Sequence, residues 1–157
     1  MRGLLLVALF LAVLATPSSA EIAGKRPHVV DAASFELLGV RVRLFGVAAP
    51  PVTQTCFAGG QRWNCGQAAR WALVERIGLN WVVCDERGRD ASGAVIALCA
   101  LGGRGGPELN GWIVARGWAL ARPDESPDYS AEEAAARQAG RGIWAGGFVP
   151  PPAWRQQ

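Results

Sequence analysis

The chain has 157 residues, half of them hydrophobic, and its formal net charge at pH 7 is +3. This length allows one domain with a conventional buried core and excludes a second domain. The charge is too small to indicate nucleic-acid binding by itself.

The N-terminal segment has the three-part pattern of a secretory signal. Arg2 is followed by an unbroken apolar run over residues 4–15, and then by small residues at Ser18 and Ala20. The run is shorter than the roughly 20 residues that span a bilayer. We therefore expect residues 1–20 to be removed as a signal peptide, so that the protein is exported to the periplasm or secreted and keeps no membrane span. A retained N-terminal anchor is the alternative.

The four cysteines predict two disulfides rather than a metal site, because an exported chain meets an oxidising compartment. Cys84 and Cys99 lie on two apolar segments, and a hairpin closed by a turn at residues 90–93 places them directly opposite each other. Cys56 is then left to pair with Cys65. Zinc is a weak alternative, since neither pair has Cys-x-x-Cys spacing and the chain's one histidine is distant.

After the leader, residues 21–27 are expected to be a polar spacer, and the periodicity over residues 28–155 predicts strands first and mainly helices later. The expected strands are residues 28–31, 34–38, 40–45, 80–86 and 94–101, and the expected helices are residues 67–77, 107–116 and 130–138. Residues 50–64 are expected to form a loop, and Ser130 with Glu133 a capping box. This order predicts a mainly β, α+β fold: a five-stranded barrel of the oligonucleotide-binding type with about three packed helices.

Several motifs carry a more specific signal. The central one runs Arg43-Leu-Phe-Gly-Val-Ala-Ala-Pro-Pro51. Others are Cys65-Gly66-Gln67-Ala68-Ala69, Leu109-Asn110, Gly117-Trp118-Ala119, Tyr129, Glu132-Glu133, Ala136-Arg137 and Gly142-Ile143-Trp144. Together they resemble the motifs of the staphylococcal nuclease (thermonuclease) family over about residues 28–155.

The resemblance implies a calcium-dependent phosphodiesterase site with carboxylate metal ligands, a glutamate base and two phosphate-binding arginines. Carried over residue by residue, the two metal-ligand positions are Ala33 and Ala48, the base is Pro51 and the second arginine is Ala94. Only Arg43 keeps the family's residue. Arg122 and Glu125 stand in the region where family members place nucleotide-stacking tyrosines. The resemblance therefore implies a degenerate member with no intact catalytic residue and no calcium cofactor.

Three functions are compatible with such a chain. The first is an exported, non-catalytic pseudo-nuclease that acts as a binding or interaction module, its partner a nucleic acid or other phosphate-bearing ligand, or an unidentified protein. Phosphate contacts would come from Arg41, Arg43, Arg87 and Arg89 if they share one mouth of the barrel. The second is an active phosphodiesterase with a relocated or metal-independent site, and the third is a structural secreted domain. A relocated site would draw on nearby acids that are more simply solvated edge or turn residues, namely Asp31, Glu36, Asp85, Glu86 and Asp90.

Overall fold

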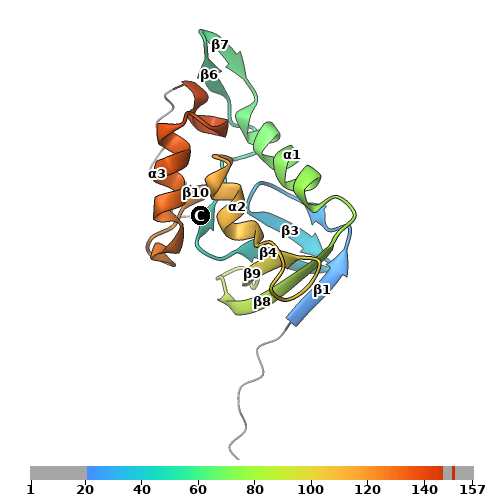
Figure 1. Cartoon of the computed structure of the whole chain (residues 1–157). Helices are drawn as coiled ribbons and strands as arrows, with labels where there is room; N and C mark the ends of the chain where they lie inside the picture. Colours follow the sequence, from blue (N-terminus) through green and yellow to red (C-terminus); the bar gives the residue numbers. More distant parts are fainter. Residues whose placement is uncertain (1–20, 147–149, 151–157) are drawn as a thin grey trace, which may run out of the picture.

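The computed structural model describes residues 21–146 and residue 150. The expected signal peptide lies outside these residues. The described part of the chain folds as a curled, mixed β-sheet with three α-helices packed against it (Figure 1). No helix in this part is long and apolar enough to span a bilayer.

Alternating side chains build the main sheet. In β4 (Val40–Leu44), Val42 and Leu44 are buried while Arg41 is exposed, as the period-2 pattern predicts. The six strands lie in the order β1-β8-β9-β4-β3-β2, and only the β4–β9 pair is parallel. The other five are β1 (Glu21–Lys25), β2 (His28–Val29), β3 (Ser34–Leu37), β8 (Trp81–Arg89) and β9 (Val95–Leu101).

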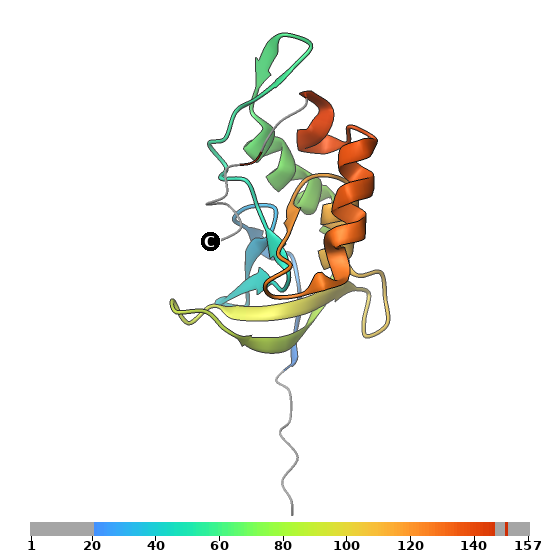
Figure 2. The same cartoon turned by 90° about the vertical axis from the view of Figure 1, so that its left-hand side faces the viewer.

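Two small two-stranded sheets complete the β structure. One pairs β5 (Val47–Ala48) with β10 (Leu120–Ala121), and the other is the hairpin of β6 (Cys56–Ala58) and β7 (Gln61–Trp63). Figure 2 shows this hairpin projecting at the end of the molecule opposite the long β8–β9 ribbon.

The helices cover the concave side of the sheet and enclose the core. They are α1 (Cys65–Ile77), α2 (Leu109–Ala115) and α3 (Ser130–Gln138), with 3₁₀ turns η1 (Pro127–Tyr129) and η2 (Gly142–Gly146) on either side of α3. Apolar side chains of α1 and α2 are fully buried against strands β3, β4, β8 and β9. The predicted i, i+4 stripe of α1 is confirmed, since Ala69, Leu73 and Ile77 are its buried face.

The predicted fold class is confirmed, but the predicted strands omit β5 at Val47–Ala48, and two longer segments also needed correction. Residues 21–25, predicted as part of a spacer, form edge strand β1 against β8. The strand is short and contains Gly24, where an added Cβ would lie only 2.9 Å from the Leu37 side chain. A small residue is required there, so the strand lacks the run of β-branched residues by which strands are usually recognised. The predicted loop at residues 50–64 contains the β6–β7 hairpin, which has no alternating buried face.

The predicted capping box is wrong. Ser130 is the first residue of α3 and makes no side-chain cap, and the Glu133 carboxylate instead accepts the backbone N–H of Ala121 at 2.7 Å. Ser126 caps the preceding 3₁₀ turn by accepting the Asp128 N–H. The 3₁₀ turn η1 therefore leads directly into α3. The Glu133 carboxylate binds the backbone of β10 and does not cap its own helix.

Both predicted disulfides are present, Cys56–Cys65 and Cys84–Cys99. Cys84 and Cys99 are direct register partners, as the hairpin prediction required. A bulge after Glu86 shifts the register, so that Asp90 pairs its backbone with Ala94 at the tip. Two disulfides are typical of proteins in an extracellular or periplasmic compartment.

Candidate functional site

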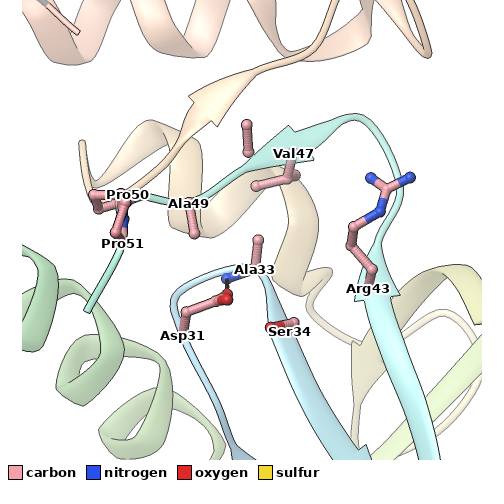
Figure 3. A pocket seen from close by; sticks show the side chains of 9 residues that line it. Asp31, Ala33, Ser34, Arg43, Val47, Ala49, Pro50 and Pro51 are labelled. Atoms are coloured by element: carbon pink, nitrogen blue, oxygen red, sulfur yellow. Dashed lines mark hydrogen bonds between the residues drawn. The ribbon is translucent and has the colours of Figure 1, made fainter. Parts of the chain in front are cut away.

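The positions implied to be catalytic meet in one pocket. Ala33, Ala48, Pro51 and Arg43 all line a small cavity of about 80 Å³ where β3, β4 and β5 approach each other. In Figure 3, Asp31 and Ala33 face Val47 and the Pro50–Pro51 turn, with Arg43 at the edge. Ala94 lines a neighbouring pocket that shares Arg43. Four of the five positions that the resemblance implies thus lie together, and the fifth is in the adjacent pocket.

The residues of this pocket do not fit calcium. A calcium ion takes about six to eight oxygen ligands, usually including several carboxylates. Asp31 is the one carboxylate that lines the pocket, and its Oδ1 already accepts the backbone N–H of Ala33 at 2.8 Å. Within the described residues, no group of three or more histidine, cysteine, aspartate or glutamate side chains is placed to hold a metal.

The surviving arginine is held by a carboxylate from the other half of the chain. Arg43 Nη1 and Nη2 donate to the two carboxylate oxygens of Glu125 at 3.0 and 2.6 Å, a bidentate pair between residues 82 apart in sequence. Both side chains are mostly buried, with 14% and 16% of their surface exposed. Such paired, charge-assisted hydrogen bonds are strong and directional. The guanidinium that would hold a phosphate is therefore already bound.

Glu125 is the centre of a wider network. Its carboxylate also accepts the Gly46 N–H at 2.9 Å and lies 3.0 Å from Arg122 Nη1. Burial raises the pKa of Glu125, but hydrogen bonds from Arg43 and Gly46 and the charges of both arginines outweigh it and hold the pKa below the usual glutamate value. Glu125 is ionised at neutral pH and neutralises part of the positive charge at the pocket.

The four arginines predicted to bind phosphate do not form one cluster. Arg41 and Arg43 line a common pocket of about 230 Å³ near the β8–β9 tip, where Arg41 donates to the Ser92 carbonyl at 3.2 Å. Arg89 pairs with Glu86 at 3.0 Å, and Arg87 is exposed on β8. Neither Arg87 nor Arg89 lines that pocket.

The nearby acids have the plain roles expected for turn and edge residues. Asp90 accepts hydrogen bonds from Ser92 and Ala94 within its own turn, and the Ser92 hydroxyl contributes most to lowering the pKa of Asp90. Asp85 approaches Arg104 at 3.7 Å, and Glu36 is exposed on β3. They do not converge on a second acidic centre.

We expect Glu125→Gln to lower the free energy of unfolding by about 1–3 kcal/mol at pH 7, because two arginines and the Gly46 N–H lose an ionised partner. A carboxyl with a lowered pKa stabilises the fold above its unfolded pKa and loses this effect as the pH falls through the folded value. The gap between wild type and variant should therefore close below about pH 4, measured by urea unfolding across pH.

Asp124→Asn is the matched control. Asp124 pairs with Arg122 at 3.2 Å, but its side chain is 61% exposed and the pair is screened by solvent, so its loss should cost clearly less than the loss of Glu125. Equal losses in the two variants would contradict a structural role for the Arg43–Glu125 pair.

Reasoning from the sequence named Glu125 only as a residue standing where tyrosines were expected. No local pattern links it to Arg43, because the contact depends on how the turn after β10 folds over β4. A second feature, a groove of tryptophan and arginine residues between α1 and α2, was also missed. Its signal in the sequence is the i, i+4 spacing of Trp112 and Arg116, which places the two side chains on one face of α2.

The comparisons with known proteins agree with this geometry. A family model described as "Staphylococcal nuclease homologue" matches residues 41–146. The chain is also similar to the succinoglycan biosynthesis protein ExoI of Rhizobium meliloti (strain 1021), with 29% identity over 119 residues. That alignment covers 74% of this chain and 61% of the relative, so this chain matches less than two thirds of the relative's length. The family match, which spans the strands, helices and pocket described above, shows that the chain belongs to the staphylococcal nuclease homologue family.

Proposed function

We propose that this protein is an exported, non-catalytic member of its family that acts as a binding or interaction module. The lining of the pocket supports the proposal: Ala33, Ala48 and Pro51 stand where the resemblance implies three acids, and Arg43 is paired with Glu125. Loss of a positioned base typically costs about 10²–10⁴ in rate. Loss of one donor that stabilises the transition-state charge lowers the rate by a further factor of about 10²–10³, although such factors do not simply multiply.

The export part of the proposal is supported by the leader-like pattern of residues 1–20 and by the two disulfides. Selection can maintain the fold of a non-catalytic domain if a surface other than the degenerate pocket binds a ligand or partner.

We expect the oxidised protein to show no calcium-dependent rise in melting temperature, because a ligand stabilises a fold only as far as it binds. It should also not cleave single-stranded DNA above the level of its Arg43→Gln variant. Thermal melts with and without calcium, and a gel assay of a labelled oligonucleotide, are the measurements. Robust calcium-dependent cleavage by the unmodified protein would overturn the proposal and direct attention to Asp31, Asp85 and Asp90.

A repair experiment makes this result informative. The variant A33D/A48D/P51E/A94R restores the implied ligands, base and second arginine, and adding E125Q frees Arg43. We expect the four-residue variant to show a calcium-dependent rise in melting temperature. Weak cleavage is expected only when E125Q is added to it. The matched control A33N/A48N/P51Q/A94R has similar side-chain volumes without the carboxylates and should gain neither property.

A second candidate function is favoured by one comparison. The relative from Rhizobium meliloti is a succinoglycan biosynthesis protein, which suggests a role for this chain alongside glycan production. Deletion of the gene in its host, followed by measurement of surface glycan, tests this candidate without assuming any chemistry at the degenerate pocket.

A further inference from the structure

An open groove between α1 and α2 is separate from the degenerate nuclease pocket. Its volume is about 730 Å³, and its lining includes Trp71, Glu75 and Arg76 from α1, and Trp112, Arg116 and Trp118 from α2 and the residues after it. Next to the groove, Arg70 of α1 lies over the Trp71 ring at 5.3 Å and donates to the Val29 carbonyl of β2 at 2.8 Å. The groove shares no lining residue with the pocket that contains Asp31.

Two arginines in the groove stack on one tryptophan. The guanidinium carbons of Arg76 and Arg116 lie 5.0 and 6.0 Å from the centre of the Trp112 ring. Neither guanidinium forms an ion pair with another described residue, and Arg76 Nε is buried without a hydrogen-bond partner there. Stacking fixes the orientation of the guanidinium plane but uses none of its N–H donors. Both side chains are thus positioned to receive a carboxylate.

Aromatic surface in the groove remains available to a ligand. Trp71 is half exposed, at 50%, and Trp118, which is partly buried with its ring 6.3 Å from that of Trp63 in an edge-to-face contact, lines the same groove. An indole face is negative and packs well against C–H groups that carry slight positive charge. One face of a pyranose ring presents such C–H groups, so these tryptophans suit the rings of a sugar chain.

The charge of the groove favours an acidic glycan over a nucleic acid as its ligand. Arg76 and Arg116 are accompanied by the Glu75 carboxylate, so the lining carries a net charge of only about one positive unit. Surfaces for nucleic acids are strongly basic, because every nucleotide brings a phosphate. A glycan whose carboxylates are separated by neutral rings matches a lining of two arginines, one carboxylate and several tryptophans better.

From these contacts we propose that the α1–α2 groove binds an acidic polysaccharide. Sugar rings pack on Trp71 and Trp118, and carboxylates accept bidentate hydrogen bonds from Arg76 and Arg116. An open groove suits a linear chain, which can enter and leave at either end. The inference gives the binding module a ligand class and a surface, and it places them away from the family's catalytic position.

Calorimetric titration of the oxidised protein tests this with three hexamers: hyaluronan, which has a carboxylate on every second ring, uncharged chitohexaose, and a thymidine oligonucleotide. We expect hyaluronan to bind most tightly. Arg116→Gln, at an exposed position, should weaken binding about fivefold, and the double variant R76Q/R116Q about tenfold or more. Trp71→Ala should weaken it about fivefold.

The chain offers close controls. Trp81 is 48% exposed and has Lys25 over its ring at 5.6 Å, much as Trp71 is 50% exposed with Arg70 at 5.3 Å, so Trp81→Ala should change affinity less than about twofold. R62Q/R137Q removes two positive charges that stack on Phe57 and Trp144 elsewhere, and should likewise have little effect. Melting temperatures of all variants establish that they are folded.

The outcomes are separable from those of the calcium and cleavage tests. Equal binding of chitohexaose, tighter binding of the oligonucleotide, no binding of any hexamer, or equal effects of the groove and control variants would each overturn the glycan proposal. None of these results would restore a nuclease site, and calcium-dependent cleavage would not by itself alter the groove measurements.

Discussion

Replacing Asn110 by alanine is expected to lower the free energy of unfolding by about 4 kcal/mol, because each buried polar group left unsatisfied costs about 1–3 kcal/mol. The Asn110 side chain is fully buried at the start of α2. It accepts the Cys99 N–H at 3.0 Å and donates to the carbonyls of Phe45 and Ala97 at 2.9 and 3.1 Å. One amide thus joins α2 to β9 and to the end of β4.

Urea unfolding measures this loss, and Asn80→Ala is the matched control. The Asn80 amide donates to the Ile77 carbonyl at 3.0 Å at an exposed position, so its removal should cost less than about 1 kcal/mol. Asn110→Asp should also be costly, since a carboxylate can still accept from Cys99 but cannot donate to either carbonyl. Similar losses for the Asn110 and Asn80 alanine variants would show that the network contributes little.

Removing the hairpin disulfide should have the next largest effect. The two cysteines, Cys84 and Cys99, are separated by 15 residues and both are buried. Closing a loop of that length stabilises the folded state by about 3 kcal/mol in the chain-entropy model. We therefore expect C84A/C99A to unfold at clearly lower urea concentration than the oxidised wild type.

C56A/C65A provides the comparison, because its loop has a separation of 9 residues and the same model predicts about 2.5 kcal/mol. Reduction of the wild type should cost about the sum of the two losses, since the bridges lie in different clusters of the core. A loss below about 1 kcal/mol for C84A/C99A would show that other contacts hold β8 and β9 together.

The parts of the fold that the sequence predicted are those with strong local signals. Strands β4, β8 and β9 show alternation or apolar runs between turn residues, and α1 shows a four-residue apolar repeat ending at Gly78. Strand β1 and the β6–β7 hairpin lack such signals. They form because β8 offers an unpaired edge to β1 and because Cys56 and Cys65 join the ends of the hairpin segment.

The candidate site likewise contains residues that the sequence indicated and one contact that it could not predict. The resemblance implies site positions at Ala33, Ala48 and Pro51, and the structure brings these three residues into one pocket with Arg43. The partner of that arginine could not be predicted, because it is 82 residues away and belongs to an irregular turn. Charge pairing at such separation follows from the tertiary fold and leaves no periodic pattern in the sequence.

The Arg43–Glu125 pair also restricts which substitutions this protein and its relatives can accept at these two positions. A free arginine in the pocket is useful to an enzyme, but here its release would leave Glu125 partly buried beside Arg122 and the Gly46 N–H at a cost in stability. Acids introduced at positions 33, 48 and 51 would meet an arginine that is already occupied. We therefore expect residues 43 and 125 to vary together among relatives, and a gain of nuclease activity to begin with the loss of Glu125.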